Sequence, residues 1–284
     1  MRVDAHQHFW KFDPVRDAWI TEQMQAIRRD FLPEDLAPEC VANGIDATIA
    51  VQAAQSEEET LFLLELAERN SLVAGVVGWV DFCSPQVAER LRFFSQHEKL
   101  RGFRHVTQAE PDDRFLVRAD FLRGVKCLRE FDFVYDILIY PRQLPAALEL
   151  VTAVPEQRFV IDHLAKPGIK AGQTKEWKSQ IRAIAQNSNA YCKVSGIVTE
   201  ADWGAWRNED FTPYLDVVFE AFGTDRLMFG SDWPVCLVAA SYAQVVEIVD
   251  KYVEANAPAA KQKIFGENAA RCYGLKTGQH GLAA

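Results

Sequence analysis

The chain has 284 residues, of which 49% are hydrophobic and 25% are charged, and its formal net charge is −9 at pH 7. Such a composition can bury a sizeable core, and the length suits one large domain or two small ones. The negative charge argues against nucleic acid as a partner and gives no attraction to anionic membranes. No apolar run approaches the ~18 residues of a transmembrane helix, and the N-terminal residues do not resemble a signal peptide.

The six cysteines stand at wide spacings, and none belongs to a C-x-x-C pair. We interpret them as buried free thiols of a protein kept in a reducing cytoplasm. A cysteine nucleophile has no support from the neighbouring residues.

Short apolar segments recur along the chain, and their nearly continuous hydrophobicity is typical of parallel strands buried on both faces. We predict strands, in chain order, at 2–8, 47–54, 72–82, 100–106, 133–140, 158–165, 190–197 and 226–233. Helix signals such as a serine N-cap, a first-turn proline or a terminal glycine fill the intervals. Pro33 and Gly44 mark the two ends of a predicted helix at 33–43, and Ser56 with Glu59 marks the start of one at 60–70. Ser84 and Pro85 precede a predicted helix at 86–94, and Pro141 precedes one at 142–154. Further helices are predicted at 174–187, 210–222 and 239–255.

This alternation continues without a linker or a composition break and predicts an α/β fold, a single-domain (β/α)8 TIM barrel over residues 1–275. Residues 276–284 then form a C-terminal tail. The competing fold is a doubly wound open sheet, which normally has a glycine-rich phosphate turn after a strand. The sequence contains neither G-x-G-x-x-G nor a P-loop, and the barrel is therefore favoured.

In such a barrel the active site is built at the C-terminal ends of the strands. The polar residues predicted at these ends are His6, His8, Gln52, Arg104, His105, Tyr140, Asp162, His163, Ser231, Asp232 and Trp233. His6 and His8 are two positions apart on one strand, so both face the same side and can clamp a divalent ion. The alternative is that they are satisfied polar residues in a strand.

The other strand-end residues also allow two interpretations. Asp232 can ligate a metal, act as a general base, or cap the next helix. His163 can be an acid, a base, a ligand or a hydrogen-bonded core histidine. Arg104 can hold an anionic or hydroxyl-rich ligand, or form a salt bridge. The rings of Trp19 and Trp233 can pack against one face of a sugar-like ligand, although tryptophans are more often buried in the core.

Six segments of the chain resemble the amidohydrolase superfamily, its amidohydrolase 2 branch, and within it the sugar-acid lactonases of the L-fuconolactonase and L-rhamnonolactonase type. These segments are DAHQHFW, RDFLPEDL, GFRHV, VIDHLAKP, FGSDWP and IFGENAARCYG. The resemblance implies a metal-capable (β/α)8 barrel that hydrolyses small carbonyl compounds. It matches His6 and His8 to the H-x-H pair of strand one, His163 to the histidine of strand six, and Asp232 to the water-activating aspartate of strand eight.

The sequence departs from the two-metal members, which carry a lysine on strand four and a histidine on strand five. Arg104, His105 and Tyr140 stand at those strand ends instead. The resemblance therefore implies at most one divalent metal, zinc above all, bound by His6, His8 and Asp232, with His163 as a further candidate ligand. Metal dependence stays open. His105 and Tyr140, with Gln52, are then available for substrate.

The expected function is hydrolysis of a sugar-acid lactone to the free acid, with Asp232 activating water. Arg104 or the metal would stabilise the oxyanion, and His105, His163 or protonated Asp232 would protonate the departing ring oxygen. One alternative is a metal-dependent decarboxylase of a small carboxylic acid on the same barrel. Another is a non-catalytic sugar-binding barrel. The sequence indicates neither the identity of the lactone nor the oligomeric state.

Overall fold

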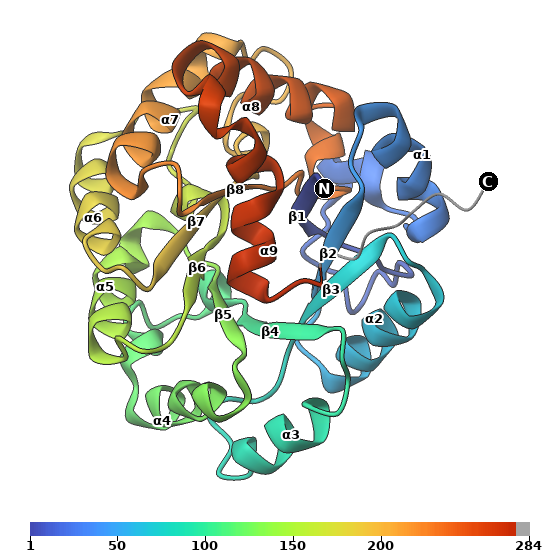
Figure 1. Cartoon of the computed structure of the whole chain (residues 1–284), viewed down its shortest axis with the longest axis vertical. Coiled ribbons are helices and arrows are strands. Elements are labelled where there is room, and N and C mark those ends of the chain that lie inside the picture. The colour runs from blue at the N-terminus through green and yellow to red at the C-terminus, as the bar shows by residue number, and fades with distance from the viewer. Residues whose placement is uncertain (277–284) are drawn as a thin grey trace.

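The computed structural model describes residues 1–276, and these residues form a barrel of eight parallel strands (Figure 1). The strands are β1 (Val3–Gln7), β2 (Ala47–Val51), β3 (Val73–Gly78), β4 (Leu100–His105), β5 (Val134–Ile137), β6 (Phe159–Ile161), β7 (Ala190–Val194) and β8 (Leu227–Phe229). Each strand pairs with the next one along the chain. The predicted (β/α)8 barrel and its eight strands are confirmed.

The predicted strands extend too far at their C-terminal ends. The third was predicted to reach residue 82 but ends at Gly78, and the sixth was predicted to reach residue 165 but ends at Ile161. Apolar residues continue past these ends because the loops at the barrel mouth are themselves buried. Val80 and Phe82, which follow β3, are at most 1% exposed.

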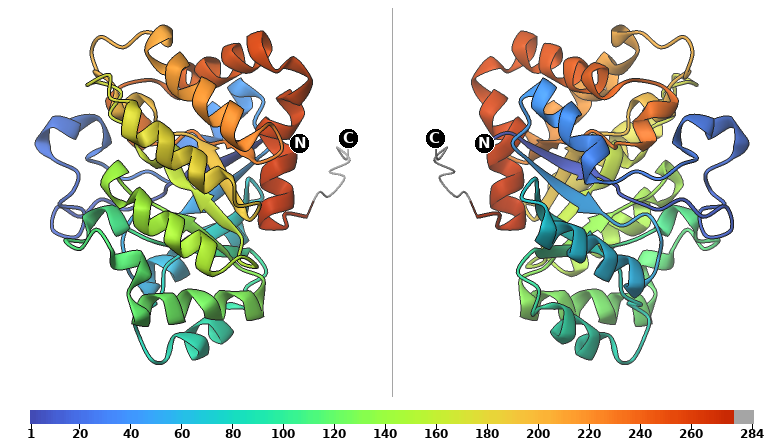
Figure 2. Two further views of the ribbon diagram at one scale, coloured as in Figure 1. Left: turned by 90° about the vertical axis from the view of Figure 1, so that its left-hand side faces the viewer. Right: turned by 90° about the vertical axis from the view of Figure 1, so that its right-hand side faces the viewer.

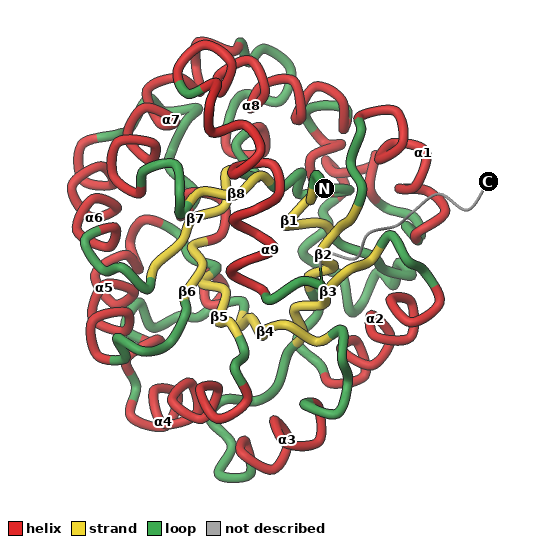
Figure 3. Tube along the Cα trace, in the orientation of Figure 1, coloured by secondary structure: helices red, strands yellow, loops and turns green. Residues whose placement is uncertain are grey.

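Helices form a ring outside the strands (Figure 3). The α-helices of the described residues are α1 (Pro33–Asn43), α2 (Glu57–Arg69), α3 (Val87–Phe94), α4 (Ala119–Cys127), α5 (Leu144–Ala153), α6 (Lys175–Ala185), α7 (Asn208–Phe222), α8 (Tyr242–Asn256) and α9 (Asn268–Tyr273). Gly44 ends α1 with φ 65°, as predicted. Within residues 1–276, no helix combines the length and the apolar character needed to cross a membrane.

Two predicted helix starts differ in detail. Ser56 Oγ accepts from Glu59 N at 3.1 Å, but the Glu59 carboxylate turns to the backbone N–H groups of residues 53 and 54 and does not complete a capping box. Ser84 is not the N-cap of α3, which begins at Val87. The Ser84 hydroxyl accepts from the backbone N–H of Gln86 in a turn that precedes the helix.

The last helix closes the end of the barrel where the strands begin. Figure 2 shows α9 at that end and the segment between β1 and α1 projecting at the other. Tyr273 of α9 packs with Val134, Val160 and Met228 in the apolar lower layer of the barrel. Its hydroxyl donates to Asp136 on β5, at 2.7 and 2.9 Å from the two carboxylate oxygens. Apart from its first residue, the predicted tail 276–284, which contains His280, lies outside the described residues.

Replacing Tyr273 by phenylalanine removes a donor from a fully buried carboxylate. We expect the free energy of unfolding, measured by urea titration, to fall by about 1.5–3 kcal/mol. Tyr252→Phe is the matched control, because the Tyr252 hydroxyl donates to the exposed Asp216 at 2.7 Å and its loss should cost about 1 kcal/mol or less. Equal losses of unfolding free energy in the two variants would show that burial of Asp136 does not increase the cost of removing its donor.

Candidate active site

The first strand places both histidines of the H-x-H pair at the barrel mouth. Relative to β2, the register of β1 shifts between Asp4 and Gln7, and such a bulge changes the direction of the side chains that follow it. Ala5 joins the apolar lower layer, whereas His6 and His8 turn toward each other. Their Nε2 atoms lie 3.2 Å apart, so the two rings do share one side.

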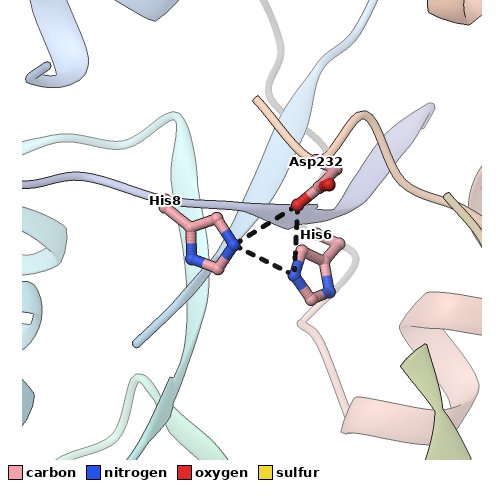
Figure 4. A group of neighbouring side chains, drawn as sticks. All are labelled: His6, His8 and Asp232. Atoms are coloured by element: carbon pink, nitrogen blue, oxygen red, sulfur yellow. Dashed lines mark hydrogen bonds and ion pairs between the residues drawn. The ribbon is translucent and has the colours of Figure 1, made fainter. Parts of the chain in front are cut away.

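Asp232 stands beside this pair at the seam where the barrel closes. A parallel bridge joins Gln7 to Trp233, and Asp232 N donates to His6 O at 2.8 Å. Asp232 Oδ1 lies 3.5 Å from His8 Nε2 and 3.9 Å from His6 Nε2 (Figure 4). The carboxylate is therefore next to the histidines with which the sequence analysis grouped it.

These three side chains have the donor chemistry of a zinc site. Their ligand atoms lie within 4.8 Å of one another, and burial lowers the pKa of both histidines, which keeps them neutral. His8 Nδ1 donates to Val51 O at 2.7 Å, so its Nε2 presents a lone pair. Asp162 Oδ1 is buried 3.3 Å from His6 Nδ1, and it pairs with Lys193 Nζ at 3.1 Å. It can accept that N–H when His6 Nε2 faces an ion.

A fully buried ion network lies behind His6. Lys193 Nζ on β7 is 2.5 Å from Asp136 Oδ2 and 3.1 Å from Asp162 Oδ1. It is also 3.1 Å from His6 Nδ1. Burial raises the pKa of Asp136 to about 6, although Lys193 opposes the shift. Burial acts in the same direction on Asp162, but Lys193 and His6 outweigh it and hold the pKa of that carboxyl well below its usual range.

Asp4 supports the strand end that carries Asp232. Its carboxylate accepts from Ser231 N at 2.8 Å, Ser231 Oγ at 2.6 Å and Tyr242 OH at 3.0 Å. Burial raises the pKa of Asp4 to about 6, although these hydrogen bonds oppose the shift. Asp4 of β1 thus ties the segment that follows β8 to α8, the helix that contains Tyr242.

His163 completes the group from a strained turn after β6. Residues 163–166 all have positive φ, from 49° to 57°, which costs side-chain-bearing residues about 1–2 kcal/mol each. His163 Nε2 lies 3.7 Å from Asp232 Oδ1, and His163 Nδ1 lies 2.9 Å from Ser195 Oγ. Burial lowers the pKa of His163 to about 4, so the ring is neutral at pH 7. Gly196 makes room for it, since a Cβ there would stand 2.5 Å from His163 Nδ1.

A cavity of about 430 Å³ lies over these groups. His8, Arg104, His163 and Asp232 reach it from the barrel, and Trp19 reaches it from the segment after β1. The remaining lining residues are Arg16, Ala53, Ala54, Gln55, Ser56, Val106, Gln108, Ala109, Leu138, Lys166 and Val235. The cavity thus joins the predicted catalytic groups to loop residues of mixed polarity.

The structure places His105 outside this cavity, contrary to the expected contact with substrate. Successive residues of β4 alternate in direction, so Arg104 points inward and His105 points to the helix layer. The His105 ring stacks on Phe115 with the centroids 4.7 Å apart, and its Nε2 lies 2.7 Å from Glu110 Oε1. These contacts hold the ring in the layer between β4 and the neighbouring helices.

Gln52, Tyr140 and Trp233 also do not reach the cavity. Gln52 Nε2 donates to Arg104 O at 3.1 Å, so Gln52 positions the arginine. The Tyr140 ring lies 5.6 Å from Lys166 Nζ and supports that lysine from behind. Trp233 is 2% exposed and packs in the aromatic core beside the seam.

Lys193 and Asp136 were not predicted from the sequence. The structure places Lys193 beside His6 and Asp136 beside Lys193. Each is a lone charged residue in an otherwise apolar strand, and that signal could have marked both as interior groups. Lys166 and Arg16 were also missed. Lys166 lies within the VIDHLAKP segment and could have been singled out there, whereas Arg16 comes from a loop with no comparable signal.

A histidine pair and a carboxylate at the mouth of a parallel barrel, with a cavity above them, define a hydrolase-type (β/α)8 barrel with room for one metal ion. The sequence profile of the family described as Amidohydrolase matches residues 3–275. The chain therefore belongs to the amidohydrolase family, as its motifs indicated. An amidohydrolase from Burkholderia multivorans, crystallised with bound zinc, has a TM-score of 0.93 at 43% identity and covers 97% of this chain and 100% of its own.

Two relatives cover nearly the whole chain. L-fucono-1,5-lactonase of Burkholderia multivorans is 43% identical, over 97% of this chain and 96% of that protein. L-fucono-1,5-lactonase of Burkholderia ambifaria is 35% identical, over 96% of this chain and 95% of that protein. A 5-carboxyvanillate decarboxylase from Sphingomonas paucimobilis has a TM-score of 0.65 at 15% identity, covering 97% and 99% of the two chains. At that identity the likeness shows the fold alone.

Replacing Gly196 by alanine should displace the His163 ring and destabilise the protein. The control is Gly172→Ala, because Gly172 has nearly the same backbone angle (φ +64° against +60°) but no heavy atom within 4 Å of an added Cβ. We expect the free energy of unfolding, from urea titration, to fall by about 1–3 kcal/mol more for Gly196→Ala than for the control. Equal losses would attribute the whole effect to backbone strain.

Proposed function

We propose that this protein hydrolyses the ring ester of a sugar-acid lactone to the free acid, with Asp232 as the group that activates water. The observation that carries the proposal is the Asp232 carboxylate, held 3.5–3.9 Å from three imidazoles beside the cavity. The two L-fucono-1,5-lactonases bear out the expectation of a lactone hydrolase. They make L-fucono-1,5-lactone the first substrate to test.

Asp232 is ionised at neutral pH and free to accept a proton. Burial pushes its pKa upward, but the interactions with His163 and His8 outweigh burial and hold the pKa below the usual range. As the oxygen of water bonds to the lactone carbonyl carbon, Asp232 takes the proton that water loses. The bond between the carbonyl carbon and the ring oxygen then breaks, and protonated Asp232 gives that proton to the departing oxygen.

The neutral histidines and Arg104 position this chemistry. His163 is fixed through Ser195 and faces Asp232, so it orients the carboxylate and the attacking water. Arg104 Nη1 donates to Asp162 Oδ2 at 3.0 Å, and its Nη2 donates to Gln52 O. Its guanidinium is thereby held against His6 Nε2 at 3.3 Å.

The residues present fit a single divalent metal, for which we propose zinc held by His6, His8 and Asp232. When bound, the ion supplies Lewis acidity that lowers the pKa of water and polarises the carbonyl. Support comes from the relative that was crystallised with zinc and from Asp162 Oδ1, which lies 3.3 Å from His6 Nδ1 and can accept its N–H.

The alternatives have less support. Decarboxylases among the structural neighbours are 13–16% identical and share the fold alone. No observation favours a non-catalytic sugar-binding barrel. A cytoplasmic location stays a prediction, and the free thiols of all six cysteines suit a reducing compartment.

Asp232→Asn should lower turnover of L-fucono-1,5-lactone at least about 100-fold, because an amide cannot take the proton of water. A pH-indicator assay measures the acid released. Asp225→Asn is the control, since Asp225 pairs with Lys263 on the exposed surface and should leave turnover unchanged. An Asp232→Asn variant that stays folded and keeps a tenth of the wild-type rate would refute the assignment.

Metal-stripped protein should bind one zinc ion per chain in a competition titration with a chromophoric chelator. His8→Ala should weaken this binding at least about tenfold, because even indirect partners of metal ligands contribute that much. His97→Ala, in which a partly exposed histidine near Glu68 is removed, should bind zinc like the wild type. Equal affinities in the two variants would exclude His8 as a ligand.

A further inference from the structure

The cavity carries an excess of positive charge. Arg16, Arg104 and Lys166 line it, and Asp232 is the one carboxylate among its lining residues. A lactone is neutral, so it gains little from cations in the ground state. Hydrolysis creates negative charge on the carbonyl oxygen in the transition state. That charge passes to the ring oxygen, which Asp232 protonates, and the carboxylic acid then loses its remaining proton to solvent and becomes an anionic carboxylate. Cations here therefore favour the transition state and the product over the substrate.

Two of these cations are held in place by protein partners that use part of their donors. Arg16 binds Asp17 through Nε at 2.8 Å and Nη2 at 2.7 Å, and Nη2 also donates to Lys11 O. Arg104 is held by Asp162 and by the backbone of Gln52. Neither guanidinium can turn to a ligand without breaking these contacts.

Lys166 differs from both arginines. Its nearest anionic partner is Glu200, with Oε1 3.5 Å from Nζ, which is a longer contact than those that hold the two arginines. The Tyr140 ring covers one side of the ammonium at 5.6 Å, and the side chain is 16% exposed. Its N–H groups are thus available at the cavity wall.

The strained turn after β6 is what brings Lys166 to this wall. The turn places His163 and Lys166, three residues apart, on the same cavity. Lys166 N donates to His163 O at 2.7 Å, and Trp177 Nε1 donates to Leu164 O at 2.7 Å, which locks the turn. Backbone strain that persists at a site is maintained by its surroundings and points to a role for the side chains it presents.

We propose that Lys166 is a catalytic residue that binds the negative oxygen formed at the lactone carbonyl, first in the transition state and then in the product carboxylate. The inference rests on the proposed lactone hydrolysis. Lys166 keeps its proton throughout and donates hydrogen bonds, while the proton of water still passes through Asp232 to the ring oxygen. Preorganised donors of this kind act on charge as it develops.

Lys166→Met tests this role with L-fucono-1,5-lactone, its product L-fuconate, and L-fucitol, a neutral polyol of the same configuration. We expect kcat/KM for the lactone to fall about 100-fold. The Kd of L-fuconate, from calorimetry, should rise at least about tenfold, whereas any affinity for L-fucitol should stay the same. Lys166→Arg keeps the charge and should recover part of both losses.

Lys170→Met is the matched control, because it removes the same charge four residues later from an exposed lysine paired with Asp202. It should leave all three measurements unchanged. If Lys166→Met does not fold, Lys166→Asn replaces it, since asparagine tolerates the left-handed backbone at this position.

Three results would overturn the inference: unchanged kinetics in a folded Lys166 variant, equal weakening of L-fuconate and L-fucitol binding, or the same losses in Lys170→Met. A wild-type protein that turns over no sugar-acid lactone would instead refute the proposed function itself. The two failures are distinguished by the wild-type assay alone.

Discussion

Asp162 is a fully buried carboxylate that three other strands approach, with Lys193 Nζ at 3.1 Å, Arg104 Nη1 at 3.0 Å and His6 Nδ1 at 3.3 Å. A carboxylate in this position is tolerated only because it is paired, and removing one partner would leave a buried charge without compensation. The pairing fixes where the histidine ring and the guanidinium stand. The positions of His6 and Arg104 at the barrel mouth therefore depend on charged groups that are fully buried.

The same network links the two ends of the barrel. Tyr273 of the closing helix α9 bonds to Asp136, Asp136 bonds to Lys193, and Lys193 faces His6. Barrel interiors are commonly filled by layers of branched apolar side chains. Here an apolar lower layer gives way to a charged upper one, so packing at the closed end and orientation of the histidine pair belong to one connected structure.

The fold and the central residues could be predicted from the sequence because both depend on local signals. Neighbouring residues in the sequence are enough to predict the apolar strands and the helix caps. The same holds for the short motifs that contain His6, His8, His163 and Asp232. The side to which a strand-end residue points could not be read in this way. His105 was expected in the cavity because it stands at the end of the fourth strand, yet alternation along β4 turns it outward. The bulge in β1 and the left-handed turn at 163–166 change the direction in which the following side chains point, and the sequence does not predict either one. The position of Lys166 at the cavity wall depends on that turn.

The seam between β1 and β8 has a consequence for how the site comes into being. Asp4 and Ser231 are 227 positions apart in the chain, yet they are hydrogen-bonded partners that hold the first and last strands together. During synthesis the histidine pair leaves the ribosome early and has no carboxylate beside it until nearly the whole barrel has been made. Contacts of such long range form late in folding. A growing or incompletely folded chain thus carries a solitary pair of imidazoles, and the assembled site is a property of the closed barrel only.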